Sequence, residues 1–379
     1  MLKPVNLMIW MNIFLINLNK KNSTMANINP NFASELKKYG SVNFNACYNC
    51  GTCTAVCSLS TEDDSFPREM VRFSVLGLED DIQTSLKPWL CYYCGECSES
   101  CPRTANPGEL MMAIRRYLTA KYDWTGLSGL LYKSLPLTIM AFIVTAIAVI
   151  YYSFSEGLNV EKIMDFGHLF EMISIATVFS VILLPNIIRM WWMTVLKQKK
   201  KIAFATYFKS IGELIVHMFT QKRARDCDDN EFRWLEHLVL VIGYLSLLFT
   251  TVVLDWFGTD NLFIIILGYV ESAIVFIVTV DFVGSRIKQK KEASKFSQPS
   301  DWFFVIWLFL LGFTAFVVRV FIDLDLIETN LWMYLIHLIV LVQWALLIVP
   351  FGKWTHFLYR SFAMYFDKLL KEPAKQTSK

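Results

Sequence analysis

The chain has 379 residues, of which 55% are hydrophobic and only 18% are charged, and its mean hydropathy is +0.41. A soluble protein of this length needs more polar surface, so the composition excludes two ordinary soluble domains. The net charge of +3 is too small to favour a nucleic-acid partner. Residues up to about Trp124 have a soluble composition and most of the rest is apolar, which predicts a soluble head on a membrane body.

Residues 1–24 form a separate segment that precedes a second methionine, Met25. Its apolar run Leu7–Leu18 has the length of a signal-peptide core, but it has a thin basic flank and no small-residue cleavage site. We therefore expect a start-site extension, with an interfacial membrane anchor as the alternative. The head is then residues 25–124.

Eight of the nine cysteines lie in the head, in two runs that share the spacing C-x2-C-x2-C-x3-C. In two-cluster ferredoxins, three thiolates of such a run bind one [4Fe–4S] cluster and the fourth binds the neighbouring cluster. The spacing predicts two clusters, whose ligands are Cys47, Cys50, Cys53 and Cys101 for one and Cys91, Cys94, Cys97 and Cys57 for the other.

Structural zinc is the alternative for these cysteines, but zinc sites usually take two C-x2-C pairs rather than runs of four. Ser58 replaces the proline that usually follows the fourth cysteine, which affects only the local turn. The remaining cysteine, Cys227, lies in an acidic loop and is expected to be a free thiol.

Two helices are expected beside the cysteine runs, over residues 66–77 and over Pro107–Tyr117, because each begins with proline and has apolar residues at helical spacing. The head is therefore expected to be an α-helical dicluster domain. Five head arginines could screen anionic clusters, bind an acidic partner or be simply solvated: Arg68, Arg72, Arg103, Arg115 and Arg116.

Six later segments are long and apolar enough to cross a bilayer core, which takes about 20 helical residues. They are Leu135–Tyr152, Gly167–Ile188, Leu235–Leu254, Leu262–Val283, Trp302–Ile322 and Leu331–Phe351. The alternative, a soluble helical bundle, needs polar faces at helical spacing, which these segments almost lack. We expect an all-α protein with a linker over 125–134, a six-helix transmembrane cytochrome b bundle over 135–366 and a polar tail over 367–379.

The loop charges predict an orientation. Lysine and arginine are concentrated in the loops after the second and fourth segments, and acidic residues predominate in the alternate loops. Because cytoplasmic loops hold the basic excess, both termini and the cysteine-rich head are expected in the cytoplasm. This predicts a multi-pass protein of the cytoplasmic membrane, with its cysteines in a reducing compartment that disfavours disulfides.

The five histidines are the candidate haem ligands. His237 and His356 lie near the cytoplasmic ends of predicted segments, and His168 and His337 lie nearer the outer ends. Ionisable residues within membrane segments are costly and usually functional, and two histidines per side is the arrangement that two bis-histidine haems b require. His217 lies on the polar stripe of a short amphipathic helix and is expected to be solvated, with inner-haem ligation as the alternative.

Several polar residues of the body have two interpretations. His337 and His168 could instead be ordinary histidines bonded to neighbours. Glu271 could accept a quinol proton or pair with a haem-linked group, and Arg319 could reach a haem propionate or extend to the surface. A straight helix would separate His337 from His356 by about 28 Å, although Pro350 could bend it.

The head resembles the iron–sulfur C-type polypeptide of heterodisulfide reductase, on its two cysteine runs, Pro67-Arg68-Glu69 and Trp89-Leu90-Cys91. The body resembles the haem b subunits of heterodisulfide reductase and respiratory nitrate reductase, on residues 233–237, His337 and residues 349–356. Together the two halves resemble the membrane subunit of the quinone-interacting membrane-bound oxidoreductase complex of sulfur-metabolising anaerobes.

This resemblance implies haem b beside the clusters, menaquinone as the membrane substrate and flavoprotein subunits resembling heterodisulfide reductase A as partners. It also implies adenosine-5′-phosphosulfate reductase as the terminal partner. The nitrate reductase type has a second histidine where this chain has Leu247, so His168 becomes the candidate outer ligand. The rivals are a subunit of a heterodisulfide-reductase-like or sulfite-reduction complex, and a non-haem membrane anchor for a ferredoxin.

Overall fold

The computed structural model describes residues 27–221, 231–257, 261–289 and 292–372. Within these ranges every regular element is a helix, and Thr61 and Asp64 form an isolated β-bridge. The expected all-α fold is confirmed. The predicted extension 1–24, Cys227 and residues 373–379 of the predicted tail lie outside the described ranges.

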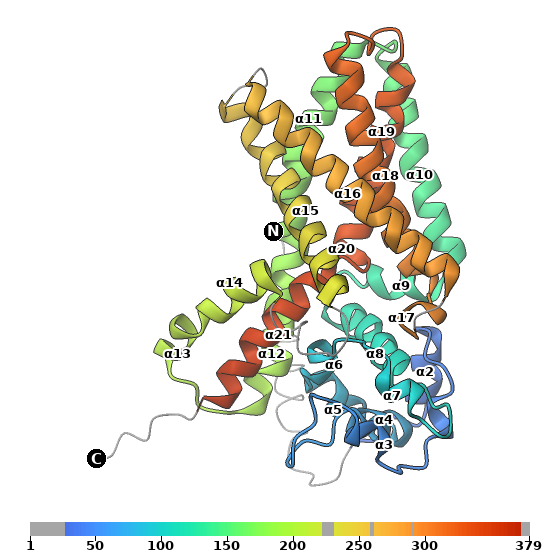
Figure 1. Cartoon of the computed structure of the whole chain (residues 1–379), viewed down its shortest axis with the longest axis vertical. Coiled ribbons are helices and arrows are strands. Elements are labelled where there is room, and N and C mark those ends of the chain that lie inside the picture. The colour runs from blue at the N-terminus through green and yellow to red at the C-terminus, as the bar shows by residue number, and fades with distance from the viewer. Residues whose placement is uncertain (1–26, 222–230, 258–260, 290–291, 373–379) are drawn as a thin grey trace, which may run out of the picture.

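The head is built from short helices around one longer, buried helix, α8 (Figure 1). Almost every residue of α8 is buried, because the other head helices cover one side of it and the membrane body covers the other. The two helices expected from the sequence are α4 and α8. The head helices are α2 (Phe32–Lys38), α3 (Thr52–Ala55), α4 (Arg68–Leu76), α5 (Glu79–Thr84), α6 (Lys87–Leu90), α7 (Glu96–Glu99) and α8 (Pro107–Tyr122).

The body is a bundle of long apolar helices standing on the head (Figure 1). α11 continues through a π-helical turn at Val178–Leu183 into α12, and α19 continues through a similar turn at Trp344–Ile348 into α20. The bundle helices are α10 (Leu135–Ser155), α11 (Val160–Thr177), α12 (Leu184–Thr194), α15 (Glu231–Phe257), α16 (Leu262–Lys288), α18 (Pro299–Asp323), α19 (Leu331–Gln343) and α20 (Val349–Phe351).

Five helices in the described residues are long and apolar enough to cross a membrane, which identifies the chain as a membrane protein. They are Leu135–Ser155, Val160–Gln198, Leu262–Lys288, Pro299–Asp323 and Leu331–Lys371. The remaining predicted segment, Leu235–Leu254, lies in α15, where Trp234–Thr250 is a shorter apolar stretch. The expected linker contains a further helix, α9 (Leu127–Lys133).

The last expected membrane segment does not continue straight into the C-terminal helix. α20 ends at Phe351, Gly352 is extended (φ −103°, ψ −162°), and α21 (Thr355–Lys371) begins three residues later. The straight-helix spacing between His337 and His356 therefore does not apply. α21 leaves the bundle and packs on the head, where the Tyr359 ring lies 5.3 Å from that of Trp89.

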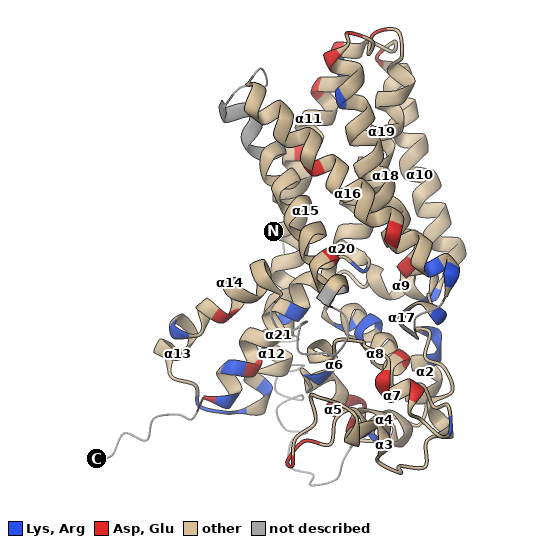
Figure 2. Cartoon of the chain, in the orientation of Figure 1, with Lys and Arg blue, Asp and Glu red and all other residues tan. Residues whose placement is uncertain are grey.

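Two short helices, α13 (Phe204–Lys209) and α14 (Ile211–Thr220), lie beside α12 and α21 at the head-side end of the bundle (Figure 1). Charged residues are sparse along the upper bundle, acidic residues mark its far end, and lysine and arginine concentrate at the head-side end (Figure 2). The head core is continuous with α12 and α21 through Met190, Tyr359 and Phe366, so head and body share one core.

Candidate functional site

The two cysteine runs fold alike. Gly51 and Gly95 have φ of 91° and 103°, a left-handed conformation that a side chain would strain. Each glycine lies directly before a short helix, α3 or α7, that carries the third cysteine of its run. The repeated turn wraps the first three thiols of each run around one point.

The first group of thiols combines one run with the last cysteine of the other. Burial, together with Cys47, Cys101 and Cys50, raises the pKa of the Cys53 thiol. Electrostatic interaction of this kind requires the four sulfur atoms to lie close together. The structure thus brings Cys101 from the second run to three thiols of the first.

The second group has the reciprocal composition. Burial, together with Cys91 and Cys94, raises the pKa of Cys57 to about 11, and burial with the same two thiols and Cys57 raises the pKa of Cys97. Cys57 thus lies with three thiols of the second run. The two groups have the membership that the spacing predicts, and ligation of a cluster by each stays a prediction.

Backbone amides point at sulfur in both groups. The amides of Asn49, Tyr93 and Ala105 donate to the Sγ atoms of Cys47, Cys91 and Cys101, each at 3.4 Å. Amide–sulfur bonds stabilise negative charge on a thiolate and are one of the contacts that set the potential of an iron–sulfur cluster.

Arg115 on α8 joins the second cysteine group to the body. Its guanidinium donates to the carbonyl oxygens of Pro88 (2.6 Å) and Cys91, and its Nη1 lies 2.9 Å from Nε2 of His356. Arginine only donates, so Nε2 of His356 accepts and is unprotonated. Burial lowers the pKa of Arg115 to about 10, which leaves it cationic at neutral pH.

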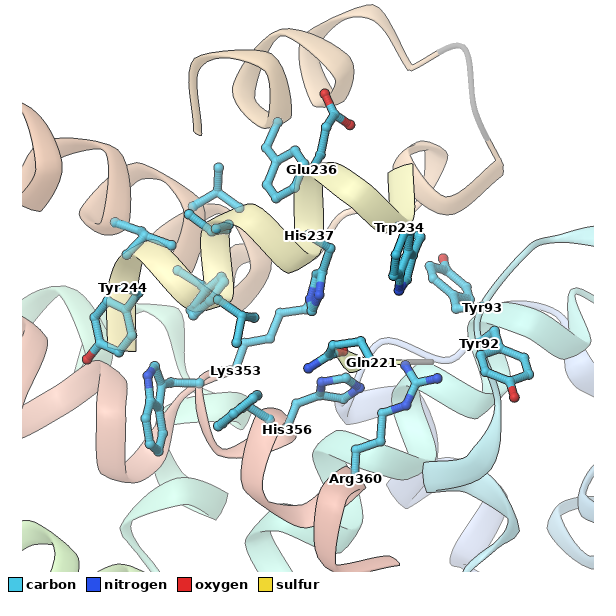
Figure 3. Close-up of a pocket in the computed structure, with 18 of the residues that line it drawn as sticks. Tyr92, Tyr93, Gln221, Trp234, Glu236, His237, Tyr244, Lys353, His356 and Arg360 are labelled. Carbon is cyan, nitrogen blue, oxygen red and sulfur yellow. The ribbon is translucent and has the colours of Figure 1, made fainter. Parts of the chain in front are cut away.

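A cavity of about 320 Å³ lies beside this contact, between the second cysteine run, α14, α15 and α21. Three of the five histidines line it, namely His217, His237 and His356, and Cys94 lines it as well. The rings of His237, on α15, and His356, on α21, point toward one another across it, with the Gln221 amide beside His356 (Figure 3). Three imidazoles and one cluster-run cysteine therefore share a single space.

The cavity walls combine an apolar side with a basic rim. A volume of this size and a mostly apolar wall with a few polar groups are typical of cofactor and small-molecule sites. The apolar side includes Leu240, Val241, Leu308 and Trp344. The basic groups are Arg115, Arg286, Lys353 and Arg360.

His217 corrects an expectation from the sequence. We expected a solvated histidine, but His217 is only 3% exposed. The reason is that the polar stripe of α14 faces the protein: Ser210 is fully buried, and Glu213 accepts a hydrogen bond from Lys368 on α21 at 3.3 Å. An amphipathic pattern defines two faces of a helix without saying which one is covered.

The other two candidate ligands lie toward the far end of the bundle, and neither lines this cavity. His337 on α19 is half-buried, and its Nδ1 lies 2.8 Å from the Thr314 hydroxyl on α18. His168 is exposed on α11, a helix that packs on α19 where Gly167 meets Tyr334. The two histidines thus belong to neighbouring helices.

The two other polar candidates of the body have protein partners. The Thr250 hydroxyl donates to the buried Glu271 carboxylate at 3.2 Å. Arg319 forms an ion pair with Asp323 at 2.6 Å, one turn along α18. Both contacts are local to the bundle, distant in sequence from the cysteine runs.

A buried ion network fixes the head to the body, and sequence reasoning missed its centre. Asp301, at the start of α18, accepts from Arg116 of α8 at 2.9 Å and from Lys353 at 2.7 Å. Arg116 also contacts Glu109, at 3.2 Å. In the sequence Asp301 shows only as a helix-capping residue, since it forms a capping box with Gln298.

Comparison with known proteins identifies the head. Residues 46–106, which include all eight clustered cysteines, match the 4Fe-4S dicluster domain family. A protein of Archaeoglobus profundus that is itself similar to the C-type polypeptide of heterodisulfide reductase is 32% identical over 91 residues, covering 24% of this chain and 48% of that protein. A C-type iron–sulfur polypeptide of the CoB–CoM heterodisulfide reductase of Methanocaldococcus jannaschii is 32% identical over 102 residues, covering 25% and 54%.

The similarity is confined to the head, and the chain spans about half the length of these curated relatives. No solved structure gives a significant match. The chain therefore carries a 4Fe-4S dicluster domain similar to iron–sulfur subunits of an oxidoreductase complex, on a body with membrane-spanning helices.

Proposed function

We propose that the chain is the membrane subunit of an oxidoreductase complex that passes electrons between menaquinol and cytoplasmic flavoprotein and iron–sulfur subunits. Electrons travel through haem b in the body and two [4Fe–4S] clusters in the head. The observation that carries this proposal is the shared cavity: Cys94 lines it with His237 and His356, and Arg115 bonds both the Cys91 carbonyl and the His356 ring.

In this proposal the two thiol groups are the cluster sites. Cys47, Cys50, Cys53 and Cys101 bind one [4Fe–4S] cluster, and Cys91, Cys94, Cys97 and Cys57 bind the other. The exchange of the fourth cysteine between runs keeps the clusters adjacent, as in two-cluster ferredoxins. The second cluster adjoins the cavity, so it receives electrons from the body first.

The cavity residues fit a haem b group. Two neutral imidazoles from opposite walls can supply the axial ligands, and we assign His237 and His356, with His217 as the competing partner. Arg286, Arg360 and Lys353 can bind the propionate groups. Bound haem supplies a one-electron carrier. Arg115, whose guanidinium bonds Nε2 of His356, must release that nitrogen when it ligates iron.

A second haem, toward the far end of the bundle, is proposed on His168 and His337. A hydrogen bond from Nδ1 to a neighbouring hydroxyl is the usual way to orient a histidine whose Nε2 binds metal, and His337 has that bond with Thr314. The alternative is that His337 is an ordinary histidine held by the same bond. Haem counting distinguishes the two.

The orientation and partners are part of the same proposal. The basic head-side end and acidic far end of the bundle support a cytoplasmic head in the inner membrane, with residues 25–124 as the cluster domain and 135–366 as the membrane domain (Figure 2). Flavoproteins resembling heterodisulfide reductase A are the proposed partners, with adenosine-5′-phosphosulfate reductase as the terminal one.

A heterodisulfide-reductase-like complex is the second candidate, because the relatives with matching heads are named as subunits of such complexes. Co-purification separates the two: a flavoprotein with adenosine-5′-phosphosulfate reductase supports the first, and a thiol-reducing iron–sulfur subunit supports the second. The same head and cavity serve either complex.

A reduced-minus-oxidised visible spectrum of the purified membrane protein tests the electron-transfer path, together with iron, acid-labile sulfide and haem counts. We expect a b-type α-band and about eight non-haem irons and eight sulfides per chain, as two [4Fe–4S] clusters require. A menaquinol analogue should produce the α-band. Clusters without an α-band would show that the body is a non-haem anchor.

A further inference from the structure

Helix α14 has the reverse orientation of an amphipathic helix on a soluble protein. Its polar residues face inward: Ser210 and His217 are buried, and Glu213 bonds Lys368 on α21. Its outer face is apolar, with Ile215 and Phe219 52% and 60% exposed. A helix with its polar face covered and its apolar face exposed is stable only if something apolar lies outside.

The apolar face continues without interruption onto α13, where Phe204 and Phe208 are 78% and 63% exposed. Tyr207 points the other way, since its ring packs on Trp191 and its carbonyl accepts from Tyr365. The successive spacings of four, three, four and four residues keep the members on one side of a helix. The stripe consists of Phe204, Phe208, Ile211, Ile215 and Phe219.

Exposed lysines surround the stripe. They are Lys197, Lys199, Lys200, Lys201 and Lys209. Acidic residues of the same segment, 196–220, number one, Glu213, which is on the inward face. An apolar stripe flanked by lysines is the composition of helices that lie in the interface of a membrane with anionic lipids.

The position of the segment matches this composition. It follows α12 directly, and α12 ends a candidate membrane span on which Ile188 and Trp192 are each 52% exposed. In Figure 1, α13 and α14 lie at the head-side end of the bundle, on the side away from α2 and α7. The stripe therefore continues a lipid-facing surface rather than facing the head.

We infer that residues 196–220 form an interfacial anchor that binds anionic phospholipid on the head side of the membrane. The stripe enters the boundary between headgroups and acyl chains, and the lysines contact the phosphates. Because His217 is on the opposite face of α14, lipid binding holds this histidine against the cavity. The inference does not depend on which cofactor or quinone the cavity takes.

Photo-crosslinking tests what covers the stripe. The photoreactive amino acid p-benzoylphenylalanine is introduced at Phe208 of the full chain in native membranes, and at Leu214 as an inward-facing control, since Leu214 packs against the head core. Mass spectrometry should find phospholipid adducts at Phe208 and adducts within the chain at Leu214. Adducts to another protein at Phe208, or no adduct there, would overturn the inference.

Lipid selectivity provides the second arm. The double variant Lys199→Gln/Lys201→Gln is placed in nanodiscs of phosphatidylcholine with phosphatidylglycerol, and retained lipid is measured by native mass spectrometry. We expect phosphatidylglycerol affinity to fall about fivefold per lysine at low salt and less at high salt. Lys37→Gln/Lys38→Gln, in exposed positions of α2, is the matched control. Equal retention by the two variants would contradict an anionic-lipid anchor.

Discussion

At the scale of single residues, His356 is the point where the head and the body meet. Its ring accepts a bond from Arg115 and lies within 6.2 Å of the Trp89 ring, both from the head. It also lines the cavity with His237 and His217. A ligand at this position would sit next to the second thiol group, so electron transfer between body and head needs no further carrier.

Replacing His356 with alanine should remove one haem and spare both clusters, because the cysteine ligands do not involve this residue. The measurement is haem, iron and sulfide content of the purified variant. His217→Ala and His237→Ala, assayed in parallel, identify the second axial ligand as the one whose loss has the same effect. Full haem content in His356→Ala would refute the assignment of this residue.

Arg115 should tune the potential of the second cluster. Removing its buried cation in Arg115→Met disfavours the more negative, reduced cluster, so the midpoint potential should fall by tens of millivolts. Redox titration followed by electron paramagnetic resonance measures this. Arg115→Lys keeps the charge but loses the forked bonds to two carbonyls, so it should lower stability and leave the potential nearly unchanged. A potential unaffected in both variants would mean that Arg115 has only a structural role.

The cysteine groups were predictable from spacing, because ligand spacing within a run is a local property of the chain. Asp301 was not, because its partners Arg116 and Lys353 are far from it in sequence and only folding brings them together. The burial of His217 was missed for the related reason that burial is set by neighbouring elements, here α21 and the cavity wall.

At the scale of elements, α16 and α18 pack so closely that one contact tolerates no side chain. A Cβ at Gly312 would lie 2.8 Å from the backbone nitrogen of Phe276, so the helices must separate to admit it. Gly312→Ala should therefore lower the free energy of unfolding by about 1–3 kcal/mol, as overpacking does. Thermal unfolding in detergent measures the loss.

The matched control for this contact is Gly268→Ala on α16, where an added Cβ would meet nothing within 4 Å. Alanine is the better helix former, so this variant should unfold at the wild-type temperature or slightly above it. If both substitutions lowered the unfolding temperature equally, close packing at Gly312 would not be the cause.

The break between α20 and α21 also belongs to this scale. The sequence indicated a possible bend at Pro350, and the structure has the chain extended at Gly352. The break lets α21 leave the bundle and pack against α6, α8 and α12 of the head and body. It thereby brings His356 to Arg115, which an unbroken helix would have carried past the head.

At the scale of the whole molecule, the buried network around Asp301 holds the head on the bundle. Asp301→Ala would leave Arg116 and Lys353 without their shared carboxylate in a buried site, which typically costs about 3–5 kcal/mol. We expect a large fall in unfolding temperature and faster proteolysis between head and body. Both are measurable on the purified protein.

Asp323→Ala is the control for this network, since it removes a more accessible carboxylate from an ion pair with Arg319. A surface pair of this kind contributes about 0–1 kcal/mol, so stability should change little. Equal destabilisation by the two variants would show that the Asp301 network has no special role in joining the two parts.

The sequence by itself determined the all-α class, the dicluster head and the apolar body, because ligand spacing, helical periodicity and segment length are written in short stretches of chain. Only the tertiary structure decided which side of α14 is covered, where α21 turns and which histidines share a cavity with the second cysteine run. These depend on contacts between α8, α14, α15 and α21, which are remote in sequence, and their packing energies are not encoded in any one of the four helices.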